Sequence, residues 1–169
     1  MARVNVMTAI TDNANHFKKQ RIGMWLIEVI EGTPTTYQGI LTRDCIGGQE
    51  LTLQLLANAL TKVKSLDIQI DSIAMYMDCQ LVESALLNQW LDKWFKNDWL
   101  RSRDRELADR DTWIIVWNLL TALGDRYIVM REPSSFENWM HTQLKSELKK
   151  IDDKKAAEEA VERVKEILK

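Results

Sequence analysis

The chain has 169 residues, of which 46% are hydrophobic and 28% are charged, and its formal net charge is −2. These values are typical of one globular domain with a substantial core. The weak negative charge argues against a protein that coats nucleic acid by charge alone. The sequence contains no apolar run of membrane-spanning length and no signal-peptide pattern, and Cys45 and Cys79 lack metal-ligand spacing. We therefore expect a cytoplasmic protein with no membrane partner.

Strand patterns dominate the first half of the chain. Alternating, β-branched residues predict strands at 3–12, 22–32 and 36–43, joined as an antiparallel meander. Apolar residues then recur at helical spacing from 49 to about 63, and the apolar run at 73–78 follows as a fourth strand. Because a crossover helix joins parallel strands, this strand should lie parallel to one already in the sheet.

The second half is mostly helical. Helices are predicted at 80–97 and 112–124, separated by a charged loop, and a fifth strand at 126–132 ends before Pro133. Ser134 or Ser135 should cap the next helix, which runs to about Lys150, and Glu137 can complete a capping box. The residues that follow form an amphipathic helix, which either packs on the domain or associates with a partner helix or a second copy.

These elements predict an α/β fold. Its mixed five-stranded sheet has three antiparallel strands followed by two parallel ones, and helices flank it. Residues 1–150 should form the domain and residues 151–169 a C-terminal helical extension.

Four segments resemble ribonuclease H of type 1. The segment MDCQLV at 77–82 is similar to the family's Thr-Asp-Ser-Gln-aromatic-Val signature and places Asp78 on its metal-binding aspartate. NQWLDKWFKNDW at 88–99 resembles the family's handle helix, and LADRDTWIIVWNLL at 107–120 resembles the segment after it. GGQELTLQLLANAL, which begins at Gly47, places Glu50 on the catalytic glutamate. The resemblance covers about residues 4 to 148 and implies a ribonuclease H-like fold.

The resemblance also implies an activity, the cleavage of the RNA strand of RNA–DNA hybrids. In that family two Mg²⁺ or Mn²⁺ ions, held by carboxylates, activate water and stabilise the leaving oxygen. The expected catalytic and metal-binding residues are Asp12, Glu50 and Asp78. The expected substrate-binding residues are Gln80, Trp90, Lys93, Trp94, Lys96, Trp99, Arg101 and Asn138.

The chain departs from the family pattern at several positions. Thr142 stands where the family has its fourth carboxylate, and the preceding loop contains no His. Glu137 and His141 lie in the same turns but do not match the motif. A second alignment puts Ala9 at the first catalytic position, although Asp12 is preferred because it follows Thr11 and precedes a small-residue turn.

Charge on the expected handle is nearly balanced. Residues 92 to 110 contain six cations and five anions, so binding to phosphates should be weak and sensitive to salt. The alternative to an enzyme is therefore a catalytically degenerate ribonuclease H-like module that binds nucleic acid or a protein partner.

Overall fold

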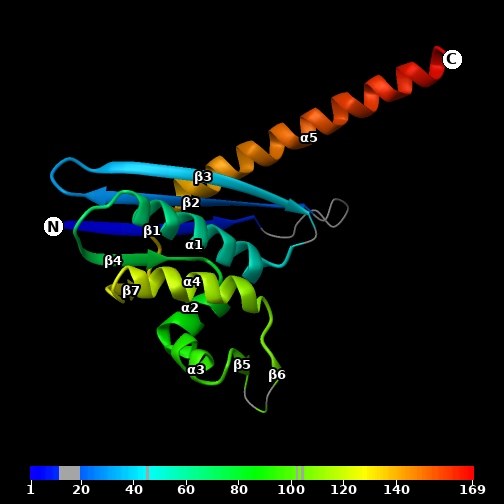
Figure 1. Cartoon of the computed structure of the whole chain (residues 1–169). Coiled ribbons are helices and arrows are strands. Elements are labelled where there is room, and N and C mark those ends of the chain that lie inside the picture. The colour runs from blue at the N-terminus through cyan, green and yellow to red at the C-terminus, as the bar shows by residue number, and fades with distance from the viewer. Residues whose placement is uncertain (12–19, 45, 102, 104) are drawn as a thin grey trace.

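A computed structural model describes residues 1–11, 20–44, 46–101, 103 and 105–169. Its main sheet has the strand order β3-β2-β1-β4-β7 (Figure 1). The strands are β1 (Ala2–Ile10), β2 (Gln20–Ile30), β3 (Thr35–Asp44), β4 (Ile70–Tyr76) and β7 (Tyr127–Val129). Strands β1, β2 and β3 pair antiparallel, whereas β4 lies parallel to β1 and β7 parallel to β4. The predicted mixed sheet of three antiparallel and two parallel strands is confirmed.

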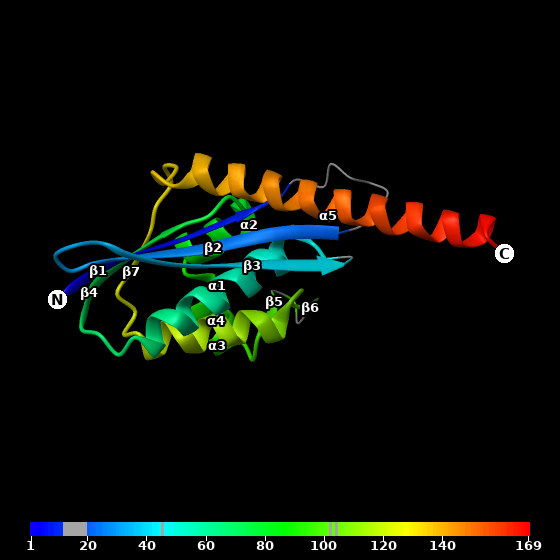
Figure 2. The same cartoon turned by 90° about the horizontal axis from the view of Figure 1, so that it is seen from above.

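Helices cover both faces of this sheet. The helices are α1 (Gly48–Ser65), α2 (Gln80–Leu87), α3 (Trp90–Lys96), α4 (Arg110–Ala122) and α5 (Glu137–Ile167). Helices α1 and α4 lie on one face and α5 lies on the other (Figure 2). The face under α1 and α4 carries the larger apolar core, which includes Leu53, Leu56, Val116 and Trp113. A smaller cluster joins Met7, Ala9, Ile22, Met24 and Leu26 to Met140 and Leu144 of α5.

Residues 80–97, predicted as a single helix, form two helices, α2 and α3. Helix α2 ends at Leu87, where the Asn88 side chain donates to the Ser84 carbonyl at 2.8 Å. Gln89 then has a φ of 55°, a left-handed conformation that an uninterrupted α-helix cannot contain. This turn redirects the chain before Trp90, so α3 belongs to a separate projecting unit.

That unit, which we call the handle, comprises α3, a second sheet made of two short strands, and the start of α4. Strands β5 (Leu100–Arg101) and β6 (Arg105–Glu106) pair antiparallel within the segment predicted as a loop. The fifth strand of the main sheet is also shorter than predicted, because β7 pairs with β4 only from residue 127 to 129.

The start and the end of α5 both differ from the predictions. No side chain caps the helix, and the residue before its first turn is Phe136, which packs on the smaller core cluster. The Glu137 N–H donates to the Ser134 carbonyl at 3.2 Å, so burial of Phe136 and a backbone turn start the helix. The helix then runs without a break across residues 150 and 151, and the predicted extension is its continuation.

Only the first part of α5 packs on the sheet. Ile151 contacts the smaller cluster, and the Lys155 Nζ donates to the Gln20 Oε1 at 3.1 Å. Every residue from 156 to 169 is exposed. Of the two alternatives for this segment, packing on the domain therefore holds only as far as Lys155. None of the described helices could span a membrane.

Candidate functional site

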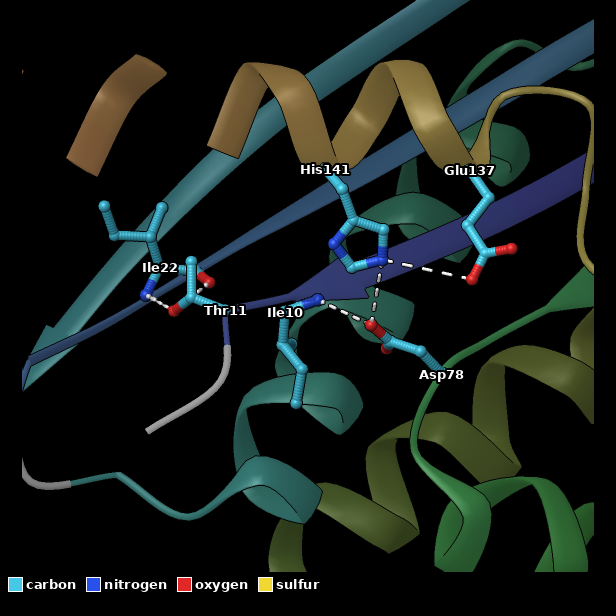
Figure 3. Close-up of polar contacts among 6 residues, drawn as sticks. All are labelled: Ile10, Thr11, Ile22, Asp78, Glu137 and His141. Atoms are coloured by element: carbon cyan, nitrogen blue, oxygen red, sulfur yellow. Dashed lines mark hydrogen bonds and ion pairs between the residues drawn. The ribbon is translucent and has the colours of Figure 1, made fainter. Parts of the chain in front are cut away.

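Asp78 lies at the end of the parallel strand pair β1–β4. The register pairs Met7 with Tyr76, and continuing it by two residues places Ala9 beside Asp78. The Ile10 N–H donates to the Asp78 Oδ2 at 3.1 Å (Figure 3). Although the residue as a whole is open to solvent, the side chain of Asp78 is only 23% exposed. The hydrogen bond from Ile10 thus holds the Asp78 carboxylate against the end of β1.

The first turns of α5 face this carboxylate. The His141 Nε2 lies 3.6 Å from the Asp78 Oδ2 and 4.0 Å from the Glu137 Oε1 (Figure 3). Burial raises the pKa of Asp78 above its ordinary value, whereas the Ile10 N–H and His141 oppose this and Glu137 adds to it. The i, i+4 spacing of Glu137 and His141 indicates from the sequence that the two side chains share one helix face. Nothing in the sequence indicates that this face lies against Asp78.

Ala9 and Asp78 line one small pocket of about 90 Å³, together with Arg131, Ser134 and Glu137. Ala9 is thus the β1 residue that lies beside Asp78, as in the second alignment of the sequence. Asp12 lies outside the described residues, and its predicted role as a ligand stays a prediction. We call this region, made of Ala9, Asp78, Glu137 and His141, the polar edge.

Glu50 belongs to the first turn of α1, which begins close to the end of β1. A Cβ placed on Gly48 would lie 3.2 Å from the Ile10 Cδ1, so the apolar side chain of Ile10 lies against the start of the helix. The Glu50 Oε1 accepts a long hydrogen bond of 3.5 Å from the Gln54 Nε2. Ile10 therefore contacts both Asp78, two residues beyond the end of β4, and the start of α1.

The residue at the missing-carboxylate position takes no part in this edge. Thr142 is exposed and donates to the Asn138 carbonyl within its own helix at 2.9 Å, and Asn138 is itself exposed. Among the described residues, no group of three or more His, Cys, Asp or Glu side chains could hold a metal ion. The described side chains by themselves therefore do not fit a two-ion centre, and the predicted ligand Asp12 lies outside them.

The handle encloses a larger groove of about 580 Å³ against the start of α1 and α2. We call it the handle groove; its lining residues are Gln49, Leu81, Ala85, Trp90, Lys93, Trp94, Asn97, Leu100, Arg101, Leu107, Ala108 and Trp113. Two of these are cations and none is acidic. The predicted substrate residues Trp90, Lys93, Trp94 and Arg101 are thus brought together, whereas Gln80, Lys96, Trp99 and Asn138 lie outside the lining.

Aromatic contacts fix the floor of the handle groove. The ring centroids of Trp94 and Trp113 are 5.1 Å apart in an edge-on arrangement, and those of Trp90 and Trp94 are 6.2 Å apart. Trp113 is 1% exposed and belongs to the larger core. Trp99, which is buried, instead packs on Trp117 at 5.8 Å, so its role is structural. Sequence reasoning did not identify Gln49 and Asn97, which line the groove through tertiary contacts.

Comparisons with known proteins identify the architecture. No protein-family model and no curated protein matches the sequence. Solved structures do match, among them LC9-RNase H1, a type 1 RNase H with the type 2 active-site motif (TM-score 0.62, 10% identity). That alignment covers 86% of this chain and 70% of the other. RNase H1 from the halophilic archaeon Halobacterium salinarum aligns with a TM-score of 0.55 and 19% identity over 84% of this chain and 93% of the other.

A third match is the foamy viral protease-reverse transcriptase in complex with an RNA/DNA hybrid. It aligns with a TM-score of 0.57 and 18% identity over 84% of this chain, which spans only 18% of the viral chain. Together with the strand order and helix placement, these matches show that the chain has the ribonuclease H-like fold. The identities are low, so the likeness defines the fold and the site residues must support any function themselves.

Proposed function

We propose that this protein is a ribonuclease H-like module that binds RNA–DNA hybrid or another duplex nucleic acid along the handle groove. The observation that carries the proposal is the groove itself, whose lining combines Lys93 and Arg101 with the partly exposed Trp90 and Trp94 and includes no acidic residue. Structures with the same fold include complexes with RNA/DNA hybrid and with double-stranded DNA.

The groove has the chemistry that a nucleic-acid strand requires. Lys93 and Arg101 are both exposed and can neutralise phosphates, and indole faces can contact sugars or unstacked bases. Asn97 and Gln49 add polar groups at the wall, although the Gln49 Nε2 already donates to the Asp109 Oδ2 at 2.9 Å. Acids outside the groove balance the handle charge, so we expect modest affinity that decreases with salt.

The test is a titration of a labelled RNA–DNA hybrid by fluorescence anisotropy at several salt concentrations. The variant Lys93→Ala/Arg101→Ala should bind more weakly, and its slope of log K against log salt should fall by roughly two. Lys149→Ala/Lys154→Ala removes the same charge from exposed positions on α5 and should leave the slope unchanged. Equal losses in both variants would reduce the binding to a general charge effect and refute a role for the groove.

Metal-dependent cleavage of the RNA strand is the second candidate. It is favoured by Asp78, a largely covered carboxylate that lies two residues beyond β4 and lines a pocket with Glu137. The described side chains alone do not form a metal group, so this candidate rests on Asp12 joining Asp78 and Glu50 as predicted from the sequence.

Cleavage of the labelled hybrid in Mg²⁺ and in Mn²⁺, with Asp78→Asn purified in parallel, separates the two candidates. Cleavage by the wild type that disappears in the variant would establish the enzyme. Product at the variant's background level in both metals, from protein that still binds the hybrid, would leave a binding module.

A further inference from the structure

The exposed half of α5 carries a continuous apolar stripe. Ala157, Val161, Val164 and Leu168 are spaced by four, three and four residues, which places them on one helix face. All are exposed, Leu168 by 80%, and the neighbouring Ile167 is 82% exposed. The helix projects away from the sheet at this point (Figure 1), and no other described element covers the stripe.

We infer that this stripe packs antiparallel against the same stripe of a second copy of the chain. The two-fold axis would pass between Glu162 and Arg163, so that each copy offers the same surface to the other. Ala157 then lies opposite the partner's Leu168, and Val161 lies opposite the partner's Val164. The smallest side chain of the stripe, Ala157, thus meets the largest, Leu168, whereas the two central valines meet each other.

The charged residues beside the stripe favour a second copy of the chain as the partner and an antiparallel orientation of the two helices. Glu158 and Lys165 flank the stripe on the same side, and the antiparallel arrangement brings Glu158 next to the partner's Lys165, twice by symmetry. On the opposite flank it places Ala160 beside the partner's Ile167, which extends the apolar contact. A parallel pair would instead place Asp153 beside the partner's Glu158, and these like charges repel.

The geometry of the domain accommodates the antiparallel pair. Among the described residues, the hydrogen bond of Lys155 with Gln20 ties α5 to the sheet just before the overlap begins. Overlap of residues 157–168 spans roughly 18 Å of helix and leaves the two sheets at opposite ends of the pair. This overlap is short, so we expect reversible association that depends on concentration.

The first experiment measures the mass of the full chain by sedimentation over a concentration series. The wild type should move from 19.7 kDa towards twice that mass as concentration rises. Val164→Glu should stay monomeric, with circular dichroism showing that it is folded, whereas Glu166→Ala on the opposite helix face should associate as the wild type does. A wild type that is monomeric throughout, or a Val164→Glu that still associates, overturns the inference.

A charge exchange then tests the direction. Glu158→Lys and Lys165→Glu should each weaken the dimer by about tenfold, and the double exchange should restore it because the ion pairs re-form with reversed polarity. Lys165 also pairs with Glu162 in its own helix at 3.3 Å, so helix content is measured in parallel. Stronger association of Glu158→Lys would indicate a parallel pair and refute the antiparallel one.

Discussion

The handle groove and the polar edge are adjacent, yet they are built in different ways. Gln49 and Leu81 line the groove, and they lie one residue from Glu50 and three from Asp78. The groove is shaped by indole rings that also belong to the core, so the contacts that stabilise the fold maintain it. The edge instead holds one strand carboxylate, with Ala9 beside it and His141 facing it. A binding surface can therefore persist through packing alone, whereas a metal cluster requires particular side chains.

The largest predicted effect comes from removing the ring that joins the groove to the core. Trp113→Ala should lower the free energy of unfolding by about 3–5 kcal/mol, because Trp113 is 1% exposed and supports Trp94. Thermal unfolding should show a fall in Tm of about 10 °C. The matched control is Trp139→Ala, at a site 41% exposed, which should cost less than about 1 kcal/mol. An equal loss of unfolding free energy in the two variants would contradict the view that Trp113 belongs to both the groove and the core.

A second substitution would make the polar edge more like a metal centre. Ala9→Asp places a carboxylate at a site 2% exposed beside Asp78, and like charge with burial should cost about 2–3 kcal/mol without metal. Addition of Mg²⁺ or Mn²⁺ should raise the Tm of Ala9→Asp but not that of Ala9→Asn. An unchanged Tm for Ala9→Asp in both metals would show that this position cannot complete a metal site.

The smallest effect concerns the protonation of Asp78. Burial raises the pKa of this carboxyl above 3.8, so ionisation is less favourable in the folded chain than in the unfolded one. The ionised form therefore lowers stability at neutral pH, and this penalty disappears as pH falls towards 3.8. Asp78→Asn should raise the Tm by about 2 °C at neutral pH, and the gain should shrink on acidification.

Thermal scans over a pH series check this, with Asp71→Asn at an exposed position of β4 as the control. A loss of stability in Asp78→Asn at neutral pH would mean that contacts with Ile10 and His141 outweigh the cost of burial.

The sequence by itself determined the five strands of the main sheet and the covering helices α1 and α4. Alternation of apolar residues predicts strands, and apolar residues at helical spacing predict helices, because each pattern marks the face that is buried. Strands β1, β2 and β3 and helix α1 lie close to the ranges predicted in this way. The Trp motif also identified Trp90, Lys93, Trp94 and Arg101, which the structure gathers in one groove.

Only the tertiary structure decided the break at Gln89, the start of α5 behind Phe136 and the neighbours of Asp78. Each depends on contacts between segments distant in sequence, which local patterns do not report. The register between β1 and β4 is the clearest case, because a shift along one strand exchanges the residue beside Asp78. Periodicity likewise marked an apolar stripe after residue 156, but only the path of α5 away from the sheet showed that the domain leaves it uncovered.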